Sequence, residues 1–423
     1  MKKFKELFNL SIGAWCLYDW ALAAFPTVII TFVFATYYTE KVATNNIIGT
    51  REWGVMIGIA GLIIAVLSPA LGTLGDYYRR RKPWLALFTV LIVLASGLLW
   101  YSYPNSAFAH RSLMVVGLGL LGVELGMVFY NALLNDITPK KFIGRISGIG
   151  WGVGYLGGIL CLLIVFSVFI KGKGAFFNLN NAVYENIRAV GPFVGLWLTL
   201  FSIPLFLFTK ERDHQNFSRK NPLKQGFFIL ITSLKELRHY PQIAIFLLAN
   251  MFYMDGLKTI FAFGGIFAAG TFGFTLDQVV LLGINMNILA GIGAITFAWL
   301  DDLWGTKKTI LLSLILMICF SIAALMAHTK TLFTIAALGL SLFVGPIQAA
   351  SRSLILKMSP QAITTEMLGL FNLSGRVTAF MGPWLFGSLT FAFGSQRYGM
   401  IVPLVFLMLG FVTLSFLRPQ RPF

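Results

Sequence analysis

Residues 146–170 read ISGIGWGVGYLGGILCLLIVFSVFI and include no Asp, Glu, Lys or Arg. A helix rises about 1.5 Å per residue, so about 20 apolar residues cross the hydrocarbon core of a bilayer. In lipid, the backbone N–H and C=O groups must pair within the segment, which favours a helix. The same charge-free pattern recurs in four further stretches: 189–209, 278–300, 310–327 and 399–416. These five stretches predict membrane-spanning helices.

Seven more segments are long and apolar with few charges: 10–38, 53–74, 84–103, 112–134, 241–267, 332–354 and 367–394. Of the 423 residues, 57% are hydrophobic and 12% are charged. The charged share is about half that of soluble domains, which excludes a soluble globular protein. The sequence therefore predicts an all-α membrane protein with twelve transmembrane helices.

The net charge of +17 is typical of nucleic-acid-binding proteins, but the positions of the cations argue against that class. If both termini are cytoplasmic, 22 of the 33 Lys and Arg lie in the N-terminus, the cytoplasmic loops and the C-terminal tail. Eight lie in outside loops and three within spans. This asymmetry follows the positive-inside rule. We expect a multi-pass protein of the inner (cytoplasmic) membrane with both termini cytoplasmic, whose partners are the lipid bilayer and no nucleic acid.

The longest polar segment, 210–240, follows the sixth span and divides the chain. It predicts an N-terminal six-helix bundle over 1–209, a cytoplasmic linker over 210–240 and a C-terminal six-helix bundle over 241–423. Within the linker, residues 223–237 have apolar side chains at helical spacing, which predicts a helix on the membrane surface.

The two halves resemble one another in their cytoplasmic loops. The second span is followed by GTLGDYYRRRK (72–82) and the eighth by AWLDDLWGTKK (298–308). In each loop an Asp at a helix end precedes a cluster of cations.

Two further matches link the halves. Three residues recur 221 positions later: Pro139 with Pro360, Gly148 with Gly369, and Gly154 with Gly375. The first span also matches the seventh in two residues: Asp19 with Asp255, and Phe25 with Phe261. All the matches occur in the same order, which favours a parallel duplication over chance similarity between apolar segments.

Residues 72–82 resemble the major facilitator loop signature, Gly-x-x-x-Asp-Arg-x-Gly-Arg-Arg, although Tyr77 and Arg79 depart from it. The signature implies a conformational latch, in which an acid caps one helix end and cations hold neighbouring ends. The alternative is a basic loop that serves topology alone. The predicted latch residues are Asp76, Arg80, Arg81, Asp302 and Lys307.

A more specific resemblance begins at residues 18–31, YDWALAAFPTVIIT. They resemble the YDWANSAF-x-TVI opening of the vacuolar amino-acid effluxer-like (autophagy-related) family of the major facilitator superfamily. Further similar segments are 130–135, 144–158, 197–204, 255–259, 268–270, 345–353 and 372–383.

This resemblance covers nearly the whole chain and implies a major facilitator fold of two six-helix bundles. It also implies a central cavity lined by spans one, four, seven and ten. Eukaryotic members are understood as exporters of amino acids, whereas most relatives in the bacterial "unknown major facilitator" branch have no assigned cargo. Here Leu22 and Ala23 replace the Asn-Ser of the motif, which removes polar groups from the first span.

Ionisable residues deep in spans are the best site candidates, because they are costly there unless paired or hydrated. The candidates for binding substrate or protons are Asp19, Glu124, Asp255, Lys258, Arg376, Asn131 and Asn372. Asp255 and Lys258 lie one helical turn apart, so they could form a static salt bridge or a binding site. Glu124 has no charged partner within its own span and is the predicted proton carrier. Arg376 could neutralise Asp255 or Glu124, or bind a substrate carboxylate.

Gly150, Gly154 and Gly158 occupy a span in which many drug–proton antiporters have a glycine- and proline-containing kink. Tyr155 stands where that proline would be. Spacing of four between the glycines favours close helix packing as their role.

The remaining residues give no sign of an enzyme or a metal centre. The four histidines lie in loops or at span ends, and the three cysteines lie in spans without metal-ligand spacing. An intramembrane enzyme would need clustered His, Asp or Ser within the spans, and a channel would need a selectivity-loop motif. We expect neither cofactor nor metal.

The sequence thus predicts a monomeric secondary transporter for a small polar metabolite, an amino acid or similar zwitterion, which is either coupled to protons or facilitative. An amino acid needs one cationic and one anionic contact, and the candidates supply both. The alternative is another solute, such as a small organic anion that binds Lys258 and Arg376 together.

Overall fold

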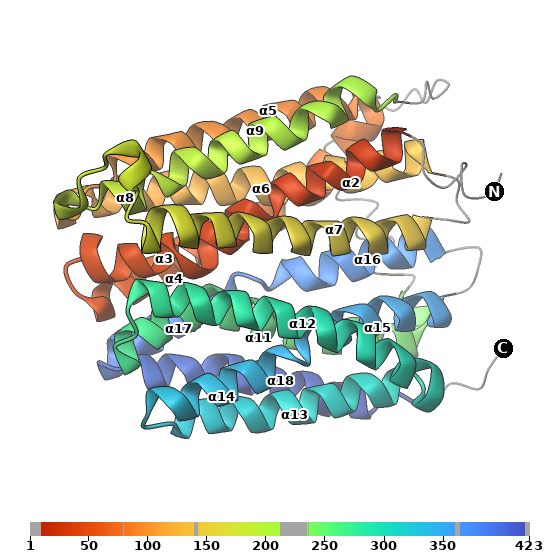
Figure 1. Cartoon of the computed structure of the whole chain (residues 1–423). Helices are drawn as coiled ribbons and strands as arrows, with labels where there is room; N and C mark the ends of the chain where they lie inside the picture. The colour runs from red at the N-terminus through yellow and green to blue at the C-terminus, as the bar shows by residue number, and fades with distance from the viewer. Residues whose placement is uncertain are drawn as a thin grey trace. The chain divides into compact units, whose positions relative to one another are not determined.

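The computed structural model describes residues 10–78, 80–138, 143–211, 235, 237–359 and 364–418, which are almost entirely helical (Figure 1). In the first half the principal helices are α2 (Leu10–Leu22), α4 (Asn46–Tyr78), α5 (Arg81–Leu98), α6 (Ala109–Ile137), α7 (Ile143–Ile164) and α9 (Val190–Phe208). In the second half they are α11 (Pro241–Phe272), α12 (Leu276–Trp304), α13 (Thr306–Met326), α14 (Lys330–Ser341), α15 (Val344–Met358), α16 (Thr364–Val377), α17 (Met381–Phe393) and α18 (Gln396–Ser415). Shorter helical turns extend several of them: η1 (Phe25–Phe32), α3 (Phe34–Tyr37), η2 (Tyr38–Val42), η6 (Val165–Lys171) and α8 (Glu185–Arg188).

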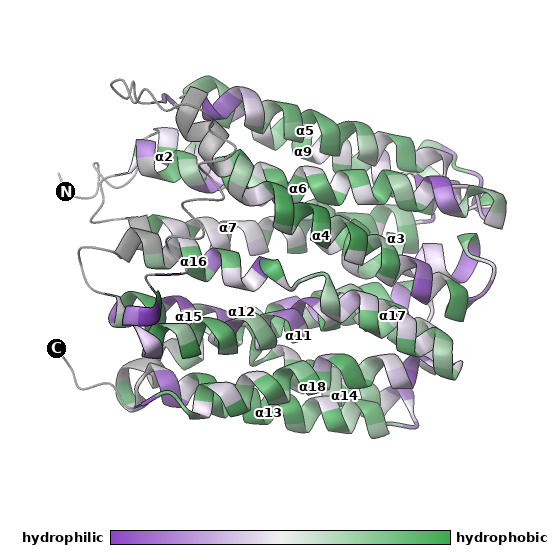
Figure 2. Cartoon of the chain, turned by 180° about the vertical axis from the view of Figure 1, so that it is seen from behind, coloured by the Kyte–Doolittle hydropathy of each residue, from purple (hydrophilic) through white to green (hydrophobic). Residues whose placement is uncertain are grey.

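The helices match the twelve predicted spans. Within the described residues, eleven helical stretches are long and apolar enough to cross a membrane. The twelfth is the segment 364–393, which is divided between α16 and α17. Figure 2 shows hydrophobic residues along most of the length of helices such as α5, α13 and α18. The surface helix expected over 223–237 lies, apart from residues 235 and 237, outside the described residues.

Three spans are interrupted just before a proline. A proline ring clashes with the carbonyl four residues earlier and has no N–H to donate to it. For Pro26, Pro346 and Pro383, that earlier residue lies at the end of a helix or in the turn that follows: Leu22, Leu342 and Ala379. The predicted spans 10–38, 332–354 and 367–394 therefore each comprise more than one helical segment. The break at 378–380 separates α16 from α17.

The two halves repeat one packing pattern. In the first half α2 packs against α7 and α9, while α5 packs against α6 and α9. In the second half α11 packs against α16 and α18, while α13 packs against α15 and α18. Each helix thus has a counterpart of the same order in the other half, which supports the predicted duplication.

Contacts divide the described residues into two units, each of which combines segments from different parts of the chain. One unit comprises the described parts of 1–44 and 66–229, and the other those of 45–65 and 230–423. The first part of α4 therefore groups with the second half. At Gly54 of α4, a Cβ atom would lie 2.4 Å from the carbonyl oxygen of Pro383, so only glycine allows this close approach.

Glycines of α7 serve close packing, as their spacing predicted. A Cβ atom at Gly157 would lie 2.4 Å from the carbonyl oxygen of Trp20, and one at Gly158 would lie 2.9 Å from Oγ1 of Thr27. The helix runs unbroken from Ile143 to Ile164. The glycines thus bring α7 against the first span without kinking it.

Candidate functional site

Asp255 and Lys258 lie on α11 beside the break between α16 and α17. Asp255 is 1% exposed, and its Oδ1 accepts a hydrogen bond from the backbone N–H of Gly382 at 3.3 Å. The ammonium of Lys258 donates to the carbonyl oxygen of Gly375 at 2.7 Å. Gly375 belongs to the last turn of α16 and Gly382 to the first turn of α17. Lys258 therefore binds the end of α16 and Asp255 binds the start of α17, which are the two helix ends that flank the break.

The charges match the helix ends that they bind. The carbonyl end of a helix carries partial negative charge, and its N–H end carries partial positive charge. Lys258 is therefore favourable at the end of α16, and Asp255 at the start of α17. The sequence left open whether these two residues form a static salt bridge or a binding site. The structure adds a third role, because both stabilise the break.

The acceptors beside the break are only partly satisfied. Oδ2 of Asp255 is buried and has no hydrogen-bond partner among the described residues. Asn250, also on α11 and 1% exposed, donates through Nδ2 to Oγ of Ser374, but its Oδ1 has no partner among those residues either. Sequence reasoning missed Asn250, although it is a buried amide on the same helix as Asp255.

Asp19 lies against α7 in the first half. A Cβ atom at Gly150 would lie 3.3 Å from Oδ2 of Asp19, and one at Gly154 would lie 3.3 Å from its Cγ. Gly154 therefore makes room for half-buried Asp19, whereas Gly150 makes room first for the Trp15 ring, whose Cζ3 would lie 2.5 Å from a Cβ atom there.

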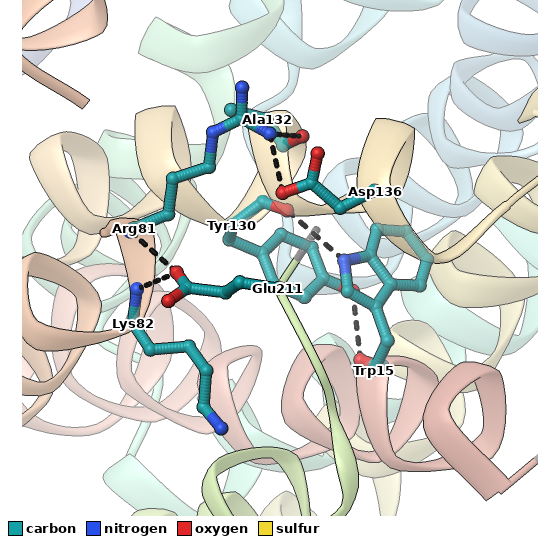
Figure 3. Close-up of polar contacts among 7 residues, drawn as sticks. All are labelled: Trp15, Arg81, Lys82, Tyr130, Ala132, Asp136 and Glu211. Carbon is teal, nitrogen blue, oxygen red and sulfur yellow. Dashed lines mark hydrogen bonds and ion pairs between the residues drawn. The ribbon is translucent and has the colours of Figure 1, made fainter. Parts of the chain in front are cut away.

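Aromatic residues next to Asp19 hold α2 against α6. Nε1 of Trp15 donates to the backbone carbonyl oxygen of Tyr130 at 3.1 Å. The hydroxyl of Tyr130 donates to the backbone carbonyl oxygen of Trp15, also at 3.1 Å. Their rings stack with centroids 4.4 Å apart (Figure 3). The hydroxyl of Tyr18 lies 2.8 Å from Oγ1 of Thr89 on α5. The residues that precede Asp19 on α2 thus bind both α5 and α6.

The remaining candidates lie on α6 and α16. Glu124 on α6 is half-buried, whereas Asn131 on the same helix is exposed. Arg376 lies in the last turn of α16 and is half-buried, whereas Asn372 is exposed. The pairing of Arg376 with Glu124 or Asp255 stays a prediction.

Charged residues join the helix ends on the predicted cytoplasmic side of the first half (Figure 3). Arg81, the first residue of α5, donates to Oδ2 of Asp136 and to the carbonyl oxygen of Ala132 on α6, both at 2.7 Å. Lys82 donates to the carbonyl oxygens of Phe206 and Thr209 at the end of α9, both at 2.7 Å. We call Arg81, Lys82, Asp136 and Glu211 the α5 anchor.

Glu211 completes the α5 anchor. Its Oε1 accepts from the backbone N–H groups of Arg81 at 2.5 Å and Lys82 at 2.6 Å, so it caps the start of α5. Asp136 and Glu211 were missed from the sequence because they lie far from the signature, whereas Lys82 lies in the 72–82 segment but was not among the predicted latch residues. Arg80 is exposed and precedes α5 without a side-chain cap hydrogen bond. The side chain of Asp76 lies outside the described residues.

The second half has a related arrangement. The ammonium of Lys307, the second residue of α13, donates to the carbonyl oxygens of Ser415 and Leu417 at the end of α18. Lys357 near the end of α15 donates to Oγ1 of Thr306 at 2.7 Å. The side chain of Asp302 lies outside the described residues.

Comparison with known proteins identifies the family. The sequence model of the family described as "Vacuole effluxer Atg22 like" matches residues 54–422. The chain belongs to this family. It is 26% identical over 425 residues to the uncharacterized MFS-type transporter YxiO of Bacillus subtilis, covering 99% of this chain and 96% of that protein. It is 24% identical over 330 residues to autophagy-related protein 22 of Kluyveromyces lactis, covering 73% of this chain and 64% of the fungal protein. The chain thus spans less than two thirds of that fungal relative.

Solved structures place this Atg22-like chain in the major facilitator fold. A bacterial homologue of the human lysosomal transporter Spinster, inward-facing and unoccupied, matches 96% of each chain with a TM-score of 0.68 at 16% identity. The nucleoside transporter NupG (D323A mutant) matches 96% of this chain and 98% of its own with a TM-score of 0.67 at 15% identity. A D-xylose–proton symporter has a TM-score of 0.67 at 13% identity and covers 96% of each chain. The Atg22-like chain therefore shares the fold of these major facilitator transporters.

Proposed function

We propose that this Atg22-like transporter moves an amino acid or a similar zwitterion across the membrane by alternating access. The observation that carries the proposal is the pair of opposite charges, Asp255 and Lys258, one turn apart on α11 beside an interrupted helix. Ionisable groups are costly within a membrane span and mark functional sites there. A zwitterion carries one group for each of the two charges.

The resemblance of residues 18–31 to the vacuolar amino-acid effluxers supports the same substrate class. The family description, "Vacuole effluxer Atg22 like", also fits export of a small solute. Leu22 and Ala23 remove two polar groups of the family motif from the first span. In this proposal, the polar contacts with the cargo therefore come mainly from α11.

Proton coupling forms the second part of the proposal, with Glu124 as the group that takes up and releases the proton. Glu124 is half-buried on α6, counted as the fourth span. The corresponding span of the second half, α14 and α15, contains no acid within residues 330–358. In this proposal, of these two corresponding spans, only the one in the first half carries an acid that can bind the coupling proton.

Orientation forms the third part. Both termini and the 210–240 segment lie in the cytoplasm of the cell whose inner membrane holds the protein, because 22 Lys and Arg then face inward. In this orientation the α5 anchor and the Lys307 contacts also lie on the cytoplasmic side. Reporter fusions after Phe423 and within residues 212–222 test this orientation, since an outside signal at either point contradicts it.

The direct test of the substrate class is a thermal-shift screen of the purified protein against amino acids, nucleosides, sugars and organic acids. A ligand that binds only the folded state raises apparent stability by RT ln(1 + [L]/Kd). Compounds that stabilise the protein are then tested for counterflow exchange in proteoliposomes. Stabilisation and exchange by organic acids but by no amino acid would replace the zwitterion with the alternative cargo, an organic anion.

The same proteoliposomes test the role of Glu124. Glu124→Gln keeps the shape of the side chain but fixes it in a neutral state. The variant should retain counterflow exchange and lose pH-gradient-driven accumulation. Retained accumulation by a well-folded variant would remove Glu124 as the proton carrier.

A further inference from the structure

The break between α16 and α17 brings two oppositely polarised helix ends together. The last turn of α16 presents backbone carbonyls and the first turn of α17 presents N–H groups. Lys258 and Asp255 already bind one group of each end, at 2.7 Å and 3.3 Å. The break is therefore a small region with both signs of charge, held by two side chains of one neighbouring helix.

Unpartnered acceptors distinguish this break from an ordinary helix interruption. Asp255 is 1% exposed and directed at the start of α17, yet its Oδ2 has no partner among the described residues. Buried polar atoms in proteins are nearly always hydrogen-bonded, and a charged one is the most costly to leave without a partner. Oδ1 of Asn250, on the same helix, is in the same state. Both atoms accept hydrogen bonds, so the region is suited to a ligand that donates them.

We propose that Oδ2 of Asp255 binds the ammonium group of the transported zwitterion and that Lys258 binds its carboxylate. The α16–α17 break is then the element that recognises both charges of the cargo. This inference rests on the proposed function and deepens it, because it assigns each charge of the cargo to one atom of α11.

The chemistry of the surroundings favours an ammonium group over other ligands. Lys258 lies one turn from Asp255, and its positive charge opposes a divalent metal ion more strongly than it opposes a singly charged ammonium. Within the described residues, no group of three or more His, Cys, Asp or Glu could hold a metal. A cargo carboxylate placed at Asp255 would be repelled by like charge. A cargo ammonium has three N–H donors and carries a single charge that complements the carboxylate.

Lys258 is suited to the other half of the cargo. Its bond to the carbonyl of Gly375 joins a charged donor to a neutral acceptor. A carboxylate is a stronger partner for an ammonium than a carbonyl is, so the cargo can compete for Lys258. The cargo is thus recognised by its two charged groups together, and analogues with one of them bind more weakly.

The test measures binding of single compounds to purified wild-type protein and variants. Each of the twenty L-amino acids is screened by thermal shift, and Kd is measured for the tightest binder. Kd is also measured for two analogues of that amino acid: the amine, in which the carboxylate is absent, and the carboxylic acid, in which the ammonium is absent. Asp255→Asn keeps an acceptor for the N–H of Gly382 while removing the charge. Lys258→Met keeps most of the length of the side chain.

Asp255→Asn should weaken binding of the amino acid and the amine by about tenfold to a hundredfold, and change binding of the acid by less than twofold. Lys258→Met should show the reverse pattern, weakening the amino acid and the acid but sparing the amine. The matched control is Asp277→Asn, which removes an exposed acid from the first turn of α12 in the same half. It should leave all three Kd values within twofold of the wild type.

Two results would overturn the inference, and they differ in what else they remove. If Asp255→Asn weakens the amino acid and the acid equally, Asp255 does not recognise the ammonium, while the proposed function stands. If no amino acid binds the wild type or exchanges in counterflow, the proposed function and this inference fail together. Should Asp255→Asn not fold, Lys258→Met decides, since equal losses for the amine and the acid would also contradict the assignment.

Discussion

The helix ends on the predicted cytoplasmic side of the two halves share one contact and differ in another. Lys82 is the second residue of α5 and binds carbonyls at the end of α9. Lys307 is the second residue of α13 and binds carbonyls at the end of α18. The lysine-to-carbonyl contact therefore appears in both halves. Such a contact needs no particular partner side chain, because the C-terminal end of every helix presents carbonyls.

The neighbouring pair differs between the halves. In the first half Arg81 binds Asp136, whose side chain is 4% exposed. At the corresponding positions of the second half, Lys357 binds the hydroxyl of Thr306. In the first half the contact joins two charged side chains, and the cation lies on α5. In the second half it joins a cation on α15 to a hydroxyl on α13. We infer that the first half depends more strongly on electrostatics at this end than the second.

The largest expected effect follows from this difference. Arg81→Met removes the guanidinium from a buried carboxylate and should lower the free energy of unfolding by about 3 kcal/mol. Lys357→Met leaves a neutral hydroxyl and should cost about 1 kcal/mol or less. Denaturant unfolding of both purified variants in one detergent measures the two costs. Equal costs would show that the halves do not differ in this respect.

A double variant separates the charge pair from general packing. Arg81→Met combined with Asp136→Leu removes both charges and should recover most of the stability lost by Arg81→Met alone. A double variant as unstable as the sum of the two single variants would assign the loss to packing rather than to the buried charge.

The lysine-to-carbonyl contacts should be similar in the two halves. Lys82→Met and Lys307→Met each remove charge-assisted hydrogen bonds to two carbonyls, and each should cost about 1.5 kcal/mol. The same unfolding measurement compares them. A difference above about 1 kcal/mol would mean that the shared geometry does not carry a shared energy.

Glu211 stabilises the first half only. It caps the start of α5 with two hydrogen bonds, whereas Gly305 precedes α13 without a side-chain cap. Glu211→Gln keeps an acceptor but removes the negative charge from the helix N-terminus, so it should cost about 1 kcal/mol. High salt should weaken the wild type toward the variant. A cost that does not depend on salt would show that geometry matters here and charge does not.

The spans and the repeat could be predicted from sequence because they follow from local patterns. Stretches such as 146–170 lack charge over a full membrane crossing, and Gly154 and Gly375 occur at a constant offset. The break at 378–380 could not be predicted from Pro383 alone, because Pro204 and Pro403 lie inside the unbroken helices α9 and α18.

Parts of the site could not be predicted because they depend on distant partners. Asp136 and Glu211 lie 55 and 130 residues from Arg81, and no local pattern joins them to it. Asp255 was predicted from its charge within a span, but its partner is a backbone N–H 127 residues away. Any residue except proline can present that group, so the sequence carries little signal for the contact.

The smallest expected effect compares two glycines at matched positions of the repeat. A Cβ atom at Gly154 would lie 3.3 Å from Cγ of Asp19 and 3.4 Å from its carbonyl oxygen, so the first span must shift slightly. At Gly375 the nearest atoms would be 3.8 Å and 4.0 Å away, which is ordinary contact. Alanine in place of glycine stabilises a helix by about 0.5–1 kcal/mol where space allows. Gly375→Ala should therefore raise the free energy of unfolding. Gly154→Ala should not, because the close contact with Asp19 offsets the helix stabilisation, so the two variants should differ by about 1 kcal/mol. Gly148→Ala and Gly369→Ala are the matched controls, because a Cβ atom at either would meet nothing within 4 Å. The two controls should behave alike, and equal stability of Gly154→Ala and Gly375→Ala would show that Asp19 adapts to α7 rather than being held by it.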